Sequence, residues 1–174
     1  RNRVKRENMK RLNLCSILIV FFLVNLHAKD DWPILKGPYL GQKPPGMTLQ
    51  LFAPEIISTE QFGEAGGAFS EACGLFLFNR RPPHEELKTI HWMVQRNGVW
   101  SKPSPVPFNS GFGDWSFAFG PDGQTLFFSS KRPVKPGAGP SGNIWSVKLV
   151  RGGWTEPKML EYPVNTPESY DSGP

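Results

Sequence analysis

Apolar residues occur in short runs separated by turn-forming residues over much of residues 62–174. The runs are rich in aromatic and β-branched side chains and cover residues 75–78, 89–94, 115–119, 125–128 and 143–150. Runs of about four to eight such residues between Gly, Pro, Asn and Asp are typical of β-strands. All 18 Gly and all 18 Pro fall in residues 29–174, where their density excludes long helices. The pattern therefore predicts an all-β domain.

The aromatic positions recur in the same order at a spacing of 50 to 54 residues. The matched pairs are Phe69 and Phe119, Phe78 and Phe128, Trp92 and Trp145, and Trp100 and Trp154. Each copy has room for four short strands, which in the second copy lie near 115–119, 125–130, 143–150 and 154. A four-stranded antiparallel unit with bulky side chains on both faces predicts a β-propeller blade, because neighbouring blades cover both of its faces.

The turn between the first two strands differs between the copies. In the second copy Asp122 and Gly123 occupy it, and such a pair is typical of a tight hairpin turn with positive φ angles. The matching residues of the first copy are Ala72 and Cys73, so we expect a different turn there.

Residues 119–130, with the sequence FGPDGQTLFFSS, resemble the F-S-P-D-G-K-x-L-x-F-x-S core of WD40-like β-propeller repeats in TolB-type periplasmic proteins. The pieces NIW at 143–145, GGW at 152–154 and PVNT at 163–166 resemble segments common in exported bacterial members of that family. The resemblance extends from about residue 62 to residue 174. It implies a closed ring of blades that serves binding.

The expected organisation has three parts. Residues 1–28 are an upstream flank and signal peptide, 29–61 a lead-in segment, and 62–174 the propeller repeats. Within the repeats we expect a first blade at about 66–114, a second at 115–167 and the start of a third at 168–174. Two to three blades make an incomplete propeller, so we expect either a fragment of a longer protein or assembly of several copies.

The leader predicts export. Lys10 and Arg11 precede an apolar run over residues 12–26, and Ala28 provides a small residue for cleavage. The uninterrupted apolar part, residues 17–24, is shorter than the ~20 residues that a membrane-spanning helix needs. We therefore expect cleavage after Ala28 and a periplasmic or secreted bacterial protein, with an uncleaved anchor as the alternative.

The formal net charge of +5 comes from this leader. Residues 1–28 contain six basic residues and one acidic residue, which leaves 14 basic and 14 acidic residues in 29–174. Nucleic-acid binding needs a basic surface, so we expect no nucleic-acid partner. The expected partner is a protein or a carbohydrate in the envelope or outside the cell, with membrane contact only through the leader.

Common catalytic and metal-binding motifs, such as G-x-S-x-G, H-E-x-x-H, C-x-x-C and the Walker loop, are missing from the sequence. His84 begins a run that lacks the second zinc-binding histidine, and His91 lies at another spacing. Cys73, the one thiol outside the leader, is expected to be an apolar buried residue. The sequence therefore predicts no catalytic residue, metal site or cofactor, and favours a protein that is not an enzyme.

Cationic residues follow the second strand in both copies: Arg80, Arg81, Lys131 and Arg132. They are candidate contacts for an anionic ligand on one rim of the ring, and ordinary solvated charges are the alternative. The tryptophans could stack on sugars, but their recurrence favours packing between blades. The expected structural positions are Phe69, Phe78, Trp92, Trp100, Phe119, Asp122, Gly123, Phe128, Trp145 and Trp154.

These features predict an exported, non-catalytic β-propeller binding module of the bacterial cell envelope, with a protein or glycan ligand. One alternative is the propeller portion of a larger secreted hydrolase, a serine peptidase or glycosidase, whose catalytic residues lie outside this sequence. Another is a structural envelope component whose strand edges pair with a partner.

Overall fold

The computed structural model describes residues 32–44, 46–167 and 169–174. The chain divides into two units, Arg1–Pro33 and Ile34–Pro174, and the second contains nearly all described residues. The predicted signal peptide with its cleavage site at Ala28 lies outside the described residues. In the described ranges no helix has the length and apolar character needed to cross a membrane.

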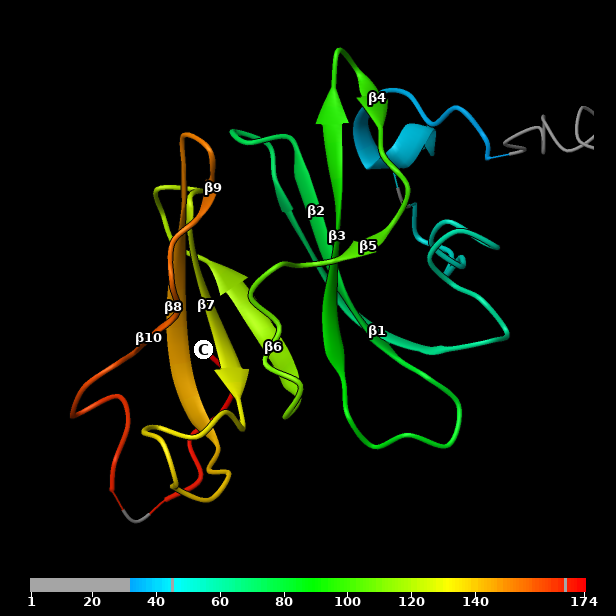
Figure 1. The fold of residues 1–174 in the computed structure, drawn as a ribbon. Coiled ribbons are helices and arrows are strands. Elements are labelled where there is room, and N and C mark those ends of the chain that lie inside the picture. Colours follow the sequence, from blue (N-terminus) through cyan, green and yellow to red (C-terminus); the bar gives the residue numbers. More distant parts are fainter. Residues whose placement is uncertain (1–31, 45, 168) are drawn as a thin grey trace, which may run out of the picture. The chain divides into compact units, whose positions relative to one another are not determined.

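Two antiparallel sheets make up most of the second unit (Figure 1). The first sheet contains β1 (Gly63–Ser70), β2 (Leu75–Arg81), β3 (Thr89–Arg96), β4 (Val99–Trp100) and β5 (Ser104–Pro105). The second contains β6 (Asp114–Phe119), β7 (Thr125–Ser130), β8 (Asn143–Val150), β9 (Gly153–Trp154) and β10 (Lys158–Met159). Among the described residues, a short turn, η1 (Pro38–Gly41), precedes them, and its residues Tyr39 and Leu40 have φ angles of +50° and +58°. The predicted all-β class with antiparallel sheets is confirmed.

The two sheets have the same topology. β2 lies between β1 and β3, and both β4 and β5 pair with β3. In the same way β7 lies between β6 and β8, and both β9 and β10 pair with β8. The outer row of each sheet is interrupted at 101–103 and at 155–157, where Pro103 and Pro157 have no N–H to donate to the neighbouring strand. β5 and β10 were not predicted because these two-residue strands contain no apolar run.

β1 contains glycines at the place where its pairing with β2 is irregular. A bulge between Ala65 and Ala68 interrupts its pairing with β2, and Gly66 there has a φ of +63°. β6 has a bulge in the same place, between Trp115 and Phe117. Bulges bend a strand and increase its twist, so the first strands of both sheets curve alike.

In the first sheet, we call the face that carries the Phe78 side chain face A. In the second sheet, face A carries the Phe128 side chain. The opposite face, with Leu77 or Phe127, is face B, because side chains alternate along a strand. Face A of the second sheet packs on face B of the first, and loop residues complete the core. The buried cluster comprises Leu75, Leu77, Ile90, Val106, Phe108, Leu126, Phe128, Trp145 and Val147. The sheets therefore stack in the same orientation, one behind the other.

The strand register corrects one alignment made from the sequence. Phe128 lies opposite Trp145, whereas Phe78 lies opposite His91, and Trp92 lies one residue further along β3. Trp92 therefore belongs to face B and Trp145 to face A, because a shift of one residue moves a side chain to the other face. The equivalent positions of β3 and β8 are 54 residues apart, not 53. Both tryptophans nevertheless border the core between the sheets.

Candidate functional site

The second sheet begins with a polar cluster around a buried carboxylate. Ser110 donates its backbone N–H and its hydroxyl to Asp114 Oδ2 over 2.6 and 3.0 Å. Arg132 Nη2 lies 2.8 Å from Asp114 Oδ1 and also donates to the Phe108 carbonyl over 2.9 Å. The Asp114 side chain is 1% exposed and that of Arg132 is 12% exposed. Arg132 therefore fixes the start of β6.

The first sheet begins with an equivalent cluster. Thr59 donates its hydroxyl to Glu64 Oε1 over 2.8 Å and its N–H to Oε2 over 3.4 Å. Arg80 Nε lies 3.3 Å from Glu64 Oε1, and Arg80 Nη2 donates to the Ile56 carbonyl. Arg80 also lies over the Phe78 ring, 5.1 Å from its centroid. Of the four candidate rim cations, Arg80 and Arg132 are thus held inside the fold by acidic partners.

The other two candidate cations, Arg81 and Lys131, are exposed to solvent. They end β2 and follow β7 at positions 50 residues apart. Each borders a pocket that also includes a Phe-Gly pair where the first strand of its sheet begins, at 62–63 and at 112–113. The pocket beside Arg81 has a volume of about 500 Å³ and the pocket beside Lys131 about 230 Å³. We call this end of the two sheets the rim.

The two rim pockets differ in charge. Glu60, Glu85 and Glu86 line the pocket of Arg81, together with exposed His84. Glu86 also reaches the neighbouring pocket, where the cations are Lys88 and Lys131. The first pocket is therefore rich in carboxylates and the second in ammonium groups.

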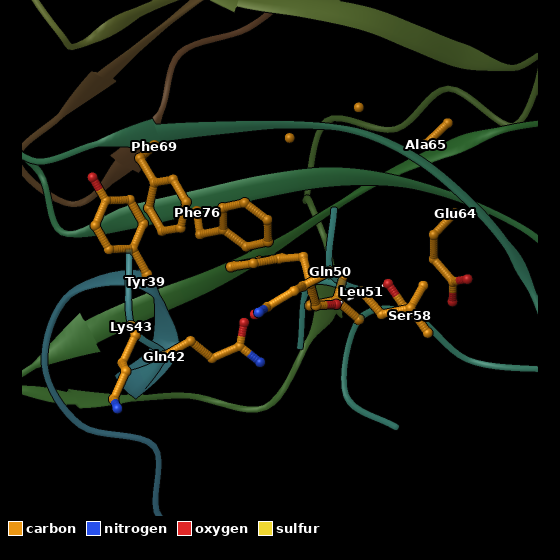
Figure 2. A pocket seen from close by; sticks show the side chains of 14 residues that line it. Tyr39, Gln42, Lys43, Gln50, Leu51, Ser58, Glu64, Ala65, Phe69 and Phe76 are labelled. Carbon is orange, nitrogen blue, oxygen red and sulfur yellow. Dashed lines mark hydrogen bonds between the residues drawn. The ribbon is translucent and has the colours of Figure 1, made fainter. Parts of the chain in front are cut away.

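A separate groove of about 470 Å³ lies between the lead-in segment and face A of the first sheet (Figure 2). Three rings form a row in it: Tyr39 and Phe69 have centroids 5.6 Å apart, and Phe69 and Phe76 have centroids 4.4 Å apart. Gln42 and Gln50 provide amides on the side of the lead-in. The groove combines an aromatic wall with polar groups.

The segment beside this groove exposes large apolar side chains. Met47, Leu49 and Leu51 have exposed fractions of 105, 101 and 72%. Leu51 also lines the groove, so the exposed segment and the aromatic row belong to one apolar surface. Such a surface is typical of a region that another element covers.

Asp122 stabilises the turn between β6 and β7. Its Oδ1 accepts N–H groups of Thr125 and Gln124 over 2.7 and 3.0 Å, and its Oδ2 accepts the Thr125 hydroxyl over 2.8 Å. These hydrogen bonds, first that of the Thr125 N–H, lower the pKa of Asp122 below its ordinary value. Of the expected pair of positive φ angles only that of Gly123 is found, at +63°.

The remaining candidate groups are packing residues. Cys73 is half-buried against the core, and its Sγ lies 3.4 Å from the Gly123 carbonyl. Burial, and secondly the nearby Arg80 charge, lower the pKa of His91, which packs on Phe78. Within residues 32–44, 46–167 and 169–174 no group of three or more His, Cys, Asp or Glu side chains could hold a metal ion.

The repeated aromatic positions lie in two layers. Phe69, Phe78 and Trp100 lie on the lead-in side of the first sheet, where the Trp100 Nε1 donates to the Gly37 carbonyl over 2.7 Å. Between the sheets, Trp92 and Trp154 have ring centroids 6.2 Å apart. Phe119, Phe128, Trp145 and Trp154 belong to this core or pack against it.

Two asparagines, which the sequence patterns did not indicate, hold β3 and β8 with pairs of hydrogen bonds. Asn109 accepts the Ile90 N–H over 3.1 Å and donates to the Ile90 carbonyl over 2.9 Å. Asn165 makes the same pair of bonds to Ile144 over 2.7 and 2.8 Å. Each asparagine is followed by Ser or Thr and lies a few residues after the last short strand of its sheet, β5 or β10. This recurrence in the sequence could have indicated both residues.

Comparison with family models, with curated proteins and with solved structures finds no match for this chain. Its function is therefore inferred from the geometry of the rim and the groove.

Proposed function

We propose that this chain belongs to an exported TolB-like β-propeller, built from WD40-like repeats, whose rim binds a glycan of the bacterial cell envelope. The observation that carries the proposal is the pair of open pockets at equivalent places, beside Arg81 and beside Lys131. A scaffold that repeats a sheet also repeats the loops at its ends. Neighbouring sites of this kind suit a ligand that is itself a chain of similar units, as a glycan is.

The stacking of the sheets supports a propeller. Asn79 on face B of the first sheet donates to the backbone carbonyl of Asp114, where β6 starts. Ser129 occupies the equivalent place on the second sheet and accepts the N–H of Gly173 over 3.0 Å. The tail after the second sheet therefore contacts face B at the position where the start of β6 contacts face B of the first sheet.

The polar cluster at the start of each sheet supports the same proposal. After the second sheet, Thr166 donates its N–H to Asp171 Oδ2 over 2.8 Å. The corresponding bond at the start of the first sheet runs from the Thr59 N–H to Glu64. At the start of the second sheet it runs from the Ser110 N–H to Asp114. The hydrogen bond from a Ser or Thr N–H to a carboxylate thus occurs a third time, at the place where a third sheet would begin.

We assign the groove of Figure 2 to packing between sheets and not to the ligand. Phe76 in the groove is equivalent to Leu126, which the first sheet covers. A sheet placed in the same way on face A of the first sheet would fill the groove and cover Met47, Leu49 and Leu51. Burial of apolar surface stabilises by about 25 cal/mol per Å², so such cover is favourable.

The experiment is a binding measurement with glycans extracted from bacterial envelopes. We compare the exported protein with a double variant, Arg81→Ala and Lys131→Ala, in sedimentation with insoluble peptidoglycan and in calorimetry with soluble surface polysaccharide. The matched control is Arg151→Ala, an exposed cation between β8 and β9 at the opposite end of the strands.

We expect binding by the unaltered protein and the control, and about tenfold weaker binding by the double variant because two charge-assisted contacts are lost. Equal binding by all three proteins would refute the rim as the site. Release of new reducing ends from the glycan would favour the hydrolase alternative.

A further inference from the structure

The rim pocket beside Lys131 is built around two stacked aromatic rings. The ring centroids of Trp115 and Tyr170 lie 6.1 Å apart, and the ring planes differ by 21°. The Tyr170 ring also lies against Gly142, where an added Cβ would come within 2.5 Å of a ring carbon. The N–H of Asp171 donates to the Gly142 carbonyl over 3.0 Å, which fixes the backbone beside the ring. Tyr170 is thus held in place although it is 57% exposed.

The charged groups of this pocket come from two other segments. Glu86 and Lys88 belong to the loop between β2 and β3, and Lys131 follows β7. Among the described residues, neither lysine forms a side-chain ion pair. Two ammonium groups and one carboxylate leave a formal charge of +1 at a pocket that is open to solvent.

This set of groups specifies the chemistry of a ligand. Aromatic rings offer an apolar platform on which the apolar face of a sugar ring can lie. The hydroxyl of Tyr170 and the carboxylate of Glu86 can bond sugar hydroxyls. A formal charge of +1 matches one carboxylate, whereas a phosphate would bring nearly two negative charges towards Glu86. The volume of about 230 Å³ suits a single sugar residue.

We propose that this pocket binds a carboxylated sugar residue of an acidic polysaccharide, a hexuronic acid, with its carboxylate between Lys88 and Lys131 and its ring against Tyr170. The proposal rests on the proposed binding function of the rim and names the class of sugar. The pocket beside Arg81, with its three glutamates, does not share this preference.

The test uses the whole chain and trigalacturonate as the probe, in isothermal titration calorimetry. The matched neutral probe is the methyl ester of the same trisaccharide, which removes the charge and retains the sugar rings. We expect binding of the acid and at least about tenfold weaker binding of the ester. Affinity for the acid should fall as salt is added, because exposed charges are screened.

Four variants separate charge from stacking. Lys88→Ala and Lys131→Ala should each weaken binding of the acid about tenfold, and the control Arg151→Ala should not. Tyr170→Ala removes the exposed ring, and Gly142→Ala displaces the same ring from beneath, so both should reduce binding. Circular dichroism of each variant shows whether it folds. If Gly142→Ala does not fold, the binding of Tyr170→Ala alone tests the role of the ring.

Equal affinity for acid and ester, or unchanged binding by both lysine variants, would overturn this inference. If envelope glycans bind in a manner that depends on the rim but trigalacturonate does not bind, the sugar class is wrong and the binding function stands. If neither binds, both proposals fail.

Discussion

Phe127 and Phe128 are adjacent on β7, but only one of them lies between the two sheets. Phe128 is 0% exposed, and its ring centroid is 5.2 Å from that of Phe108 and 5.0 Å from the guanidinium of Arg132. Phe127 points to face B, opposite Ala118, and is half-buried. Replacing each with alanine therefore measures how much the contact between the sheets contributes to stability.

The expected costs differ in magnitude. Truncation of a fully buried Phe to Ala removes its transfer free energy and leaves a cavity, which costs roughly 3–5 kcal/mol. For Phe127 no closed cavity forms and part of the ring is already in water, so we expect about 1–2 kcal/mol. Phe128→Ala should therefore lower the free energy of unfolding by about twice as much as Phe127→Ala or more.

The assay is equilibrium unfolding in urea, followed by circular dichroism and tryptophan fluorescence. A lower midpoint with an unchanged slope reports a change in stability and not in the extent of unfolding. Equal destabilisation by the two variants would refute the assignment of faces, because it would mean that both sides of β7 are equally covered.

Three further predictions concern polar groups. Arg132→Met should destabilise by about 3–5 kcal/mol in urea unfolding because it leaves the buried Asp114 carboxylate unpaired, and Lys131→Met should change little; equal effects would contradict this. Asn109→Ala should cost about 1–3 kcal/mol because the Ile90 N–H of β3 loses its partner, whereas the Ile90 carbonyl keeps the N–H of Val106; an unchanged midpoint would contradict this. The lowered pKa of His91 means that its stabilising effect is complete above about pH 6.5 and is lost as pH falls towards the folded pKa. His91→Gln should flatten the fall in unfolding midpoint between about pH 7 and pH 5, whereas the same slope in both proteins would exclude this histidine.

The strands that sequence reasoning located best are those whose apolar runs end at strong turn formers. β7 and β8 were predicted with the bounds that the structure has, because Gly123 precedes one and Gly142 precedes the other. β1 was not delineated, because its sequence GEAGGAFS has one aromatic residue and its pairing depends on contacts with β2. Local propensity is weak there, and the tertiary contacts decide.

The candidate cations show what sequence could not provide. Arg80 and Arg132 reach equivalent acidic partners, but Arg80 is the second residue after Phe78 and Arg132 is the fourth after Phe128. Aligning the two copies by sequence therefore does not place these arginines together. The same reason explains Trp92, whose match to Trp145 requires a shift of one residue that reverses the face.

Contact between the side chains of Trp92 and Trp154 is the most direct sign that the second sheet stacks on the first, because the two rings come from different sheets. The measurement is a nuclear Overhauser spectrum of the folded chain, with the indole signals assigned through Trp92→Phe and Trp154→Phe. With ring centroids 6.2 Å apart, cross-peaks between the two indole rings are expected. Their absence from a spectrum in which both sheets show their own cross-strand contacts would contradict the stacking.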